Sequence, residues 1–235
     1  GSAAGPLAHY VLPWLWPLAA VTLAAGVFGA LAAHHLKALL GYLVVISVGM
    51  LLTGVALGSV AGLAAALFYL VHSTWIAGAL FLLADLIAQQ RGDQGDLLKS
   101  GPQLRHPRLL GGLFFLGAIS VAGLPPFPGF LGKVMLLQAT GTAWPALVIW
   151  PVVLLGGLGM IIALSRAGTT LFWRGQGAAL DGRLDRVQLV ATLGMLLGSP
   201  LLMALAAPLH GYALETARQL LDVSAYFDIV RGVGP

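Results

Sequence analysis

The sequence predicts an all-α, polytopic membrane protein with about six transmembrane helices, one of them discontinuous. Of its 235 residues, 59% are hydrophobic and only 9% are charged, against about 25% charged residues in ordinary soluble domains. The mean hydropathy is +0.93, and the apolar residues gather in stretches of about 20, the length that crosses ~30 Å of hydrocarbon as a helix. These observations exclude a water-soluble globular domain, a disordered chain and a nucleic-acid-binding module. The stretches are apolar on every side, whereas membrane strands would alternate.

The apolar stretches place six spans in a predicted helix bundle over residues 1–208. They cover residues 12–33, 38–57, 60–88, 109–140, 146–172 and 187–207, with ends placed to within several residues. The fourth span is interrupted, because prolines and glycine cannot continue a stable helix. The interrupting residues are Leu124, Pro125, Pro126, Pro128 and Gly129. Residues 209–235 form a polar tail, in which 211–222 mix leucines with charges and predict a short amphipathic helix at the membrane interface.

The basic residues predict how the chain is oriented. Three loops on one side of six spans carry Lys37, Arg91, Lys99, Arg105, Arg108, Arg174, Arg183 and Arg186. The opposite side has only Arg218 and Arg231, both in the tail. Because cytoplasmic loops carry an excess of lysine and arginine, we expect these three loops in the cytoplasm of a bacterium. Both termini of this chain are then periplasmic or external. No lysine or arginine precedes the first span, so no cleavable signal peptide is expected.

Lys133 is the basic residue that lies well inside a predicted span. An ammonium at bilayer depth is costly and usually faces a bundle interior or a hydrated path. Lys133 also follows the predicted helix break, and transporters use the free backbone dipoles of broken helices as ion sites. A lysine in such a place can load and release protons. This combination indicates ion or proton transport; the alternative is a lysine that snorkels to the interface.

Other polar residues extend this predicted proton path. His72 lies near the middle of the third span, beside Ser73 and Thr74, and a neutral imidazole can pass a proton between its nitrogens. The alternative for His72 is a structural histidine bonded to a neighbouring helix. Asp85 and Arg166 are candidate ends of the path. The alternatives are that Asp85 is a solvated residue at a helix end and that Arg166 is a cation that snorkels to the interface.

Other kinds of site are not expected. The chain has no cysteine, which excludes disulfides and thiolate metal sites. No close cluster of histidine and acidic residues suggests a metal, and neither a Walker loop nor a serine nucleophile elbow is present. We therefore expect a transporter subunit with no cofactor and no metal, rather than an enzyme.

Several segments resemble one family of membrane proteins. They are HHLKALLGYLVVISVG (34–49), ALFYLVHSTWIAGALFLLADLI (66–87), AGLPPFPGFLGKVMLLQA (122–139), ALSRAGTTLFW (163–173) and TARQLLDVSAYFDIV (216–230). Together they are similar to the D-type subunits of Mrp/Pha-type multisubunit monovalent cation (Na⁺ or K⁺)/proton antiporters. That family is related to the antiporter-like subunits of respiratory complex I. The GLPP-x-x-GF-x-GK element is the most specific part, and the resemblance covers nearly the whole chain.

The resemblance implies two inverted five-helix repeats, each with one discontinuous helix, of which this chain holds most of the second. Lys133 then matches the family's lysine at the proton exit, and His72 matches the first position of a histidine-rich relay. The chain departs from the family at three positions. Ser73 and Ala77 stand where many members have histidine and lysine, and His35 replaces an acidic residue. Counterparts of the first repeat would lie upstream, so we interpret the chain as the C-terminal half of a longer one.

The leading hypothesis is a subunit of a monovalent cation/proton antiporter that contributes part of a proton path. Its partners would be other hydrophobic subunits, the lipid bilayer, protons and Na⁺ or K⁺, but not nucleic acid. One alternative is the proton-pumping subunit of an NADH:quinone oxidoreductase-type complex, which neighbouring genes would distinguish. Another is a non-conducting scaffold, which would tolerate Lys133→Ala.

Overall fold

The computed structural model describes residues 10–141, 144–177 and 184–222, and over these ranges every regular element is helical. This confirms the predicted all-α fold. The α-helices are α1 (Leu12–Ala32), α2 (Leu36–Ala56), α3 (Val60–Gln89), α4 (Pro107–Ala122), α5 (Pro128–Ala139), α6 (Trp144–Gly168), α7 (Arg186–Ala204) and α8 (Ala206–Leu221). A short 3₁₀-helix, η2 (Gly92–Gln94), follows α3, and a π-helical turn, η3 (Thr169–Trp173), ends α6.

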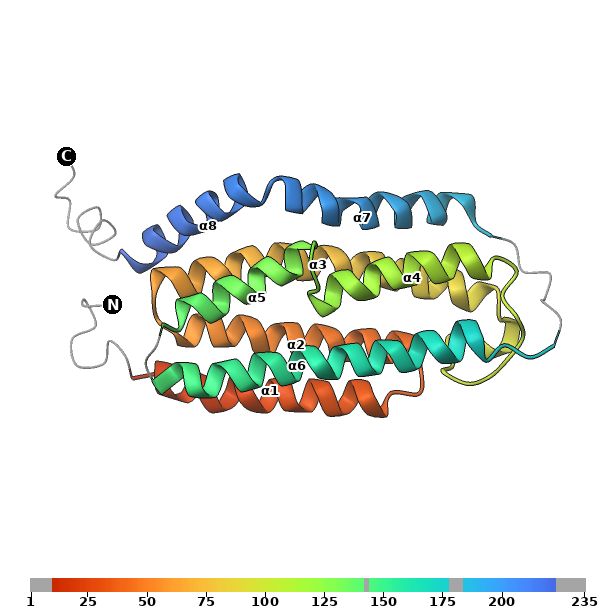
Figure 1. The fold of residues 1–235 in the computed structure, drawn as a ribbon, viewed down its shortest axis with the longest axis horizontal. Helices are drawn as coiled ribbons and strands as arrows, with labels where there is room; N and C mark the ends of the chain where they lie inside the picture. Colours follow the sequence, from red (N-terminus) through yellow and green to blue (C-terminus); the bar gives the residue numbers. More distant parts are fainter. Residues whose placement is uncertain (1–9, 142–143, 178–183, 223–235) are drawn as a thin grey trace, which may run out of the picture.

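Five of the helices are long and apolar enough to cross a membrane: α1, α2, α3, α7 and α6 together with η3. The remaining membrane-length element is built from two shorter helices. In Figure 1, α4 and α5 follow one another along the bundle, with the break between them near its middle. The structure thus confirms about six spans with one discontinuous helix, broken where the prolines and glycines predict it.

The break follows from the local sequence. Gly123 ends α4 in the left-handed conformation, with a φ of 72°, which glycine adopts without a Cβ clash. The N–H of Gly123 donates to Ser120 O and the N–H of Leu124 to Ile119 O, the paired bonds of a Schellman helix end. Pro128 then occupies the first turn of α5, where its missing N–H costs nothing.

The long helix α3 is the centre of the bundle, and it packs against α2, α4, α5, α7 and α8. On its outer side α2 packs against α1, where glycines permit a close approach. A Cβ on Gly26 would lie 2.7 Å from Ile46 Cγ1, and one on Gly49 would lie 2.6 Å from Leu23 Cγ. Small residues at such crossings are typical of membrane helices, because they let the helix backbones approach closely.

The helix predicted in the C-terminal tail over residues 211–222 is present as α8. α8 begins at Ala206, before residue 209, and runs along the first half of α3 (Figure 1). Its buried residues Ala213 and Ala217 pack in one cluster with Ala64 and Phe68 of α3. Two alanines four residues apart form a flat stripe against which a neighbouring helix can pack. The mixture of leucines and charges from which this helix was predicted did not identify the stripe. Residues 223–235 of the predicted tail lie outside the described residues.

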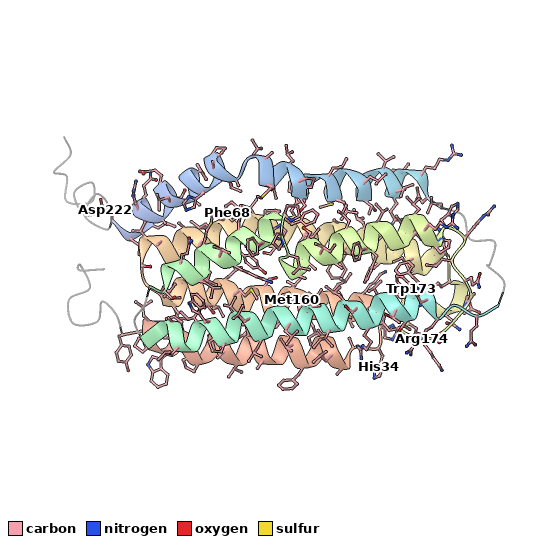
Figure 2. The ribbon with its side chains drawn as sticks, viewed as in Figure 1. His34, Phe68, Met160, Trp173, Arg174 and Asp222 are labelled. Atoms are coloured by element: carbon pink, nitrogen blue, oxygen red, sulfur yellow. The ribbon has the colours of Figure 1, made fainter. Side chains whose placement is uncertain are left out.

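The C-terminal ends of α1, α3 and η3 and the start of α7 all lie at one end of the bundle (Figure 1). The described residues at these helix ends and in the adjoining loops include Lys37, Arg91, Lys99, Arg105, Arg108, Arg174 and Arg186. Figure 2 shows Arg174 at this end and Asp222 at the other. We call it the basic end.

Candidate functional site

Lys133 lies on α5, one and a half turns beyond the helix break, and only 8% of its surface is exposed. Its Nζ donates a hydrogen bond to the backbone oxygen of Ala122, the last residue of α4. The C-terminal end of a helix carries unpaired carbonyls and a partial negative charge, so it stabilises an ammonium group. The break therefore places the negative end of the α4 dipole, rather than a carboxylate, against the buried lysine.

Two glycines leave room for the ammonium group. A Cβ on Gly123 would lie 2.9 Å from Lys133 Nζ, and one on Gly157 of α6 would lie 3.5 Å from it. Gly123 also has a positive φ, which a larger residue would adopt only with strain. The lysine side chain is therefore enclosed by the end of α4, where a Cβ at Gly123 would crowd it, and by the middle of α6, where a Cβ at Gly157 would just touch it.

His72 of α3 lies beside the break, next to Ser120 of α4 and Gly129 of α5, and is 2% exposed. Its Nε2 is 3.2 Å from the backbone oxygen of Ser120 on α4, which corresponds to the tautomer with a proton on Nε2. The Nδ1 atom is buried and has no hydrogen-bond partner among the described residues, so it is available to accept a proton. Ser120 also bonds Ser199 of α7 through their hydroxyl groups, 2.5 Å apart.

Tyr69 and Ser47 are buried polar residues next to this site that the sequence analysis did not select. Tyr69 Oη lies 3.3 Å from Ser47 Oγ on α2, and the Tyr69 and His72 rings are 6.2 Å apart. Tyr69 and Lys133 line the same small enclosed space with Met50, Ala65, Ala66, Gly132 and Leu136. One signal could have found Tyr69: it lies three residues before His72, which puts both side chains on one helix face.

Ser73 and Thr74 face a different space from Lys133. With Ser47 they line a cavity of about 170 Å³ between α2 and α3. Ser73 Oγ donates within its own helix to Leu70 O, over 3.2 Å. The structure therefore brings His72 to the helix break but directs the next two residues toward α2. The Ser47–Tyr69 pair lies between this cavity and the space beside Lys133.

Asp85 lies far from this group, at the basic end of α3. Its carboxylate accepts hydrogen bonds from Lys37 Nζ at 2.9 Å and from the side-chain amides of Gln89 and Gln188 at 3.0 Å each. The ion pair is partly exposed, with 42% of the Asp85 side chain open. Asp85 lies 13 positions after His72, which corresponds to ~20 Å of helix, so Asp85 does not join the buried group.

Arg166, the other candidate end of the path, contacts the end of α1. Its Nη2 donates to Ala33 O at 2.9 Å and to Ala30 O at 3.3 Å. These are carbonyls at the C-terminal end of α1, which have no partner within that helix. The contact joins α6 to α1, and the role of Arg166 in a proton path remains a prediction.

The loop between α3 and α4 contains a carboxylate that caps α2. His35 precedes the first turn of α2 and forms no side-chain cap. Asp96 supplies the missing acceptor from the loop, with Oδ2 3.0 Å from the backbone N of Lys37 and Oδ1 3.0 Å from His35 Nδ1. Burial raises the pKa of the Asp96 carboxyl, but its hydrogen bonds and the electrostatic attraction of His35 together lower it by more, so its pKa lies below the ordinary value.

Arg91 holds the same loop together from inside. The sequence suggested an ordinary loop charge, but Arg91 is only 2% exposed. Its guanidinium donates to the backbone oxygens of Gly95, Leu97 and Lys99. A planar group with five N–H donors can satisfy several carbonyls of one turn, so the loop folds around this side chain.

Over the described ranges, no three His, Asp or Glu side chains are placed to hold a metal ion.

The family pattern described as NADH:quinone oxidoreductase/Mrp antiporter, TM, matches residues 5–161. The chain belongs to this family. The resemblance inferred from the sequence motifs is therefore confirmed, and the chain is a membrane-embedded member of the NADH:quinone oxidoreductase/Mrp antiporter family.

Individual proteins of this family show how much of a subunit the chain represents. It is 33% identical to a probable K(+)/H(+) antiporter protein, the D-type subunit of Rhizobium meliloti (strain 1021), over 94% of this chain and 46% of the relative. It is 35% identical to the corresponding D-type subunit of the Na(+)/H(+) antiporter of Bacillus subtilis (strain 168), over 70% of this chain and 32% of the relative. The chain thus spans less than half the length of these relatives.

A solved structure has the same fold. The Mrp complex from Dietzia sp. DQ12-45-1b contains a chain that superposes with a TM-score of 0.78 and 23% sequence identity. The match covers 93% of this chain and 49% of the other. At this identity the likeness establishes the overall fold and no more.

Proposed function

We propose that this chain is part of a membrane subunit of a multisubunit monovalent cation/proton antiporter, and that it carries one section of the proton path. The observation that supports the proposal is the buried Lys133 ammonium at the end of a broken helix. Such a cation is retained at membrane depth mainly where it faces a path or a binding site. The relatives named as Na(+)/H(+) and K(+)/H(+) antiporter subunits agree with it.

In this proposal Lys133 is a loading site with two states. The protonated side chain is held by the Ala122 carbonyl and the negative end of the α4 dipole. When the proton leaves, the neutral amine loses most of this attraction. A change in the surroundings that strengthens or weakens the attraction therefore shifts the proton affinity of the amine. Gly123 keeps the carbonyl end of α4 open to the ammonium group. No covalent step is needed, and the proton gradient drives the exchange.

The neighbouring polar groups give the proton two directions. Toward α2, Tyr69 and Ser47 connect the space beside Lys133 with the cavity lined by Ser73 and Thr74. Toward α4, His72 holds its Nε2 proton against Ser120 O and presents an unoccupied Nδ1. We assign His72 as the inner neighbour of Lys133, and Ser73 and Thr74 as the polar lining of the α2–α3 cavity. Asp85 and Arg166 lie at the basic end, where a path would reach the aqueous phase.

The basic end supports the orientation in the membrane. Its loops carry most of the lysines and arginines of the described chain, and such loops face the cytoplasm in bacterial membranes. We therefore place the basic end in the cytoplasm and both termini of this chain on the external side. The other subunits of the antiporter would be its partners, and no cofactor takes part.

A second candidate is the antiporter-like, proton-pumping subunit of an NADH:quinone oxidoreductase-type complex. The matching family includes both kinds of protein, and the residues around Lys133 suit either. In this case another subunit would carry the redox chemistry, and this chain would still provide the proton path. Neighbouring genes for small antiporter subunits favour the first candidate, whereas flavin and iron–sulfur subunits favour the second.

The test is cation-dependent dissipation of ΔpH in everted vesicles. The host lacks its own antiporters and expresses the complete complex, with Lys133 native, changed to Ala, or changed to Met, which keeps the length of the side chain without its charge. Lys99→Ala, at the basic end, serves as the matched control. We expect exchange to fall to the host background in both Lys133 variants and to persist in the control, with assembly confirmed by blotting the membrane complex. If an assembled Lys133→Ala complex exchanged at the native rate, the assignment of Lys133 to the proton path would be wrong, and the scaffold hypothesis would be favoured.

A further inference from the structure

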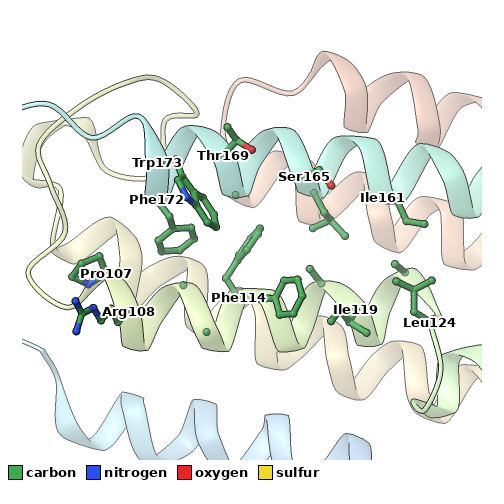
Figure 3. Close-up of a pocket in the computed structure, with 17 residues that line it drawn as sticks. Pro107, Arg108, Phe114, Ile119, Leu124, Ile161, Ser165, Thr169, Phe172 and Trp173 are labelled. Carbon is green, nitrogen blue, oxygen red and sulfur yellow. The ribbon is translucent and has the colours of Figure 1, made fainter.

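A groove with a volume of about 910 Å³ lies between α4 and the η3 end of α6 (Figure 3). Its walls are almost entirely apolar, and they include Phe114, Phe115, Ala118, Ile119, Ile161 and Phe172. Phe115 is 66% exposed and Trp173 80%, so the groove opens on the outer surface of the bundle. It belongs neither to the enclosed space beside Lys133 nor to the α2–α3 cavity.

The groove has one polar end. Arg108 and Trp173 stand at the basic end, on opposite walls, and Arg174 follows Trp173 directly (Figure 3). Arg108 is exposed and forms no hydrogen bond or ion pair with the described residues. Tryptophan and arginine are the side chains that mark the level of the lipid headgroups. The opposite end closes at Ala122 and Leu124, beside the helix break.

The length of the groove suits the acyl chains of one leaflet. From Arg108 to Ile119 the wall rises ~16 Å along α4, about half of the ~30 Å hydrocarbon core. Flexible hydrocarbon chains can fill an irregular apolar groove of this length.

From these observations we infer that the groove binds one anionic phospholipid, with its phosphate at Arg108 and its acyl chains between α4 and α6. The unpaired guanidinium supplies the charge complement, because arginine binds phosphate oxygens with two parallel N–H donors. Basic pockets between membrane helices on the cytoplasmic side are a recurrent form of lipid headgroup site. The chain ends would then cover the break near Ala122, the carbonyl that accepts from Lys133, and keep water out from the lipid side. The inference does not depend on the proposed proton path.

The experiment titrates lipid onto the delipidated protein, purified as the full chain with its companion subunits, and counts bound lipids by native mass spectrometry. Phosphatidylglycerol is compared with phosphatidylcholine of the same acyl chains. Gly112→Leu fills the groove, since a Cβ at Gly112 meets nothing within 4 Å. Gly194→Leu is its control, at an equally open glycine on the outer side of α7. Arg108→Gln removes the charge, and Arg186→Gln, at the same end, is its control.

We expect one phosphatidylglycerol to be held in preference to phosphatidylcholine. Arg108→Gln should lower that preference about fivefold, the effect of one basic residue at a charged membrane surface, whereas Gly112→Leu should abolish binding of both lipids. The two controls should bind as the native protein does. Equal losses in Arg108→Gln and Arg186→Gln, or full binding by a folded Gly112→Leu variant, would overturn the inference. A photo-reactive amino acid at Phe115 that labels a protein subunit instead of lipid would identify a helix-docking surface and overturn it as well.

Discussion

Gly129 offers a sharp test of the geometry around the helix break. It is the second residue of α5, where that helix passes α3 and α4. A Cβ at Gly129 would lie 2.6 Å from His72 Nε2 and 2.7 Å from the backbone oxygen of Ser120. These are the two atoms of the His72–Ser120 hydrogen bond. Gly129→Ala must therefore move α5 away from the break or separate that pair.

The size of the effect follows from these contacts. Inserting a methyl group into a packed site costs about 1–3 kcal/mol. Leaving a buried polar atom without its partner costs about 1–3 kcal/mol more, and the higher helix propensity of alanine returns ~1 kcal/mol. The net loss in the free energy of unfolding is about 3 kcal/mol. For a chain of this size, 1 kcal/mol changes the melting temperature by about 2–4 °C, so we expect a decrease on the order of 9 °C.

Thermal unfolding in detergent, followed by far-ultraviolet circular dichroism, measures this change. Gly112→Ala is the matched control, because a Cβ at Gly112 meets nothing within 4 Å. We expect its melting temperature to equal or slightly exceed that of the native protein. If Gly129→Ala also melts within about 2 °C of the native protein, less than ~1 kcal/mol has been lost. The close approach of α5 to His72 and Ser120 would then be refuted.

Three further predictions concern the basic end. Arg91→Leu leaves buried carbonyls without a donor, so it should destabilise the chain by about 2–4 kcal/mol and make the α3–α4 loop sensitive to limited proteolysis; an unchanged cleavage pattern would contradict the internal role of the guanidinium. Because the pKa of Asp96 is lowered in the folded chain, its carboxylate stabilises the fold above the ordinary value of 3.8, and this contribution is lost as the pH falls through the lowered pKa. The melting temperature of Asp96→Asn should thus lie below the native one at pH 6 and approach it toward pH 3, and a pH-independent difference would rule out the charged contact with His35. The exposed Lys37–Asp85 pair should show a coupling below about 1 kcal/mol in a double-mutant cycle of thermal unfolding, and a larger value would mean that the pair is more buried than its geometry indicates.

Much of the candidate site was predictable because its signals are local. A charged residue within an apolar stretch identifies Lys133, since the cost of burying an ammonium group is high wherever the helix packs. The prolines and glycines of residues 123–129 identify the break, because they restrict or free the backbone at their own positions. His72 could be selected as a polar residue near mid-span, but its contact with Ser120 could not.

The number of spans, the broken helix and the asymmetry of basic residues could be read from the amino-acid sequence, since each depends on residues adjacent in the chain. The hydrogen-bond partners, in contrast, required the packed structure. Asp96 caps α2 across 59 positions, and Ser199 meets Ser120 across 79. Nothing in the local pattern separates these residues from ordinary loop and helix positions. Their roles arise from the packing of α2, α4 and α7 around α3, which brings distant polar atoms within hydrogen-bonding distance.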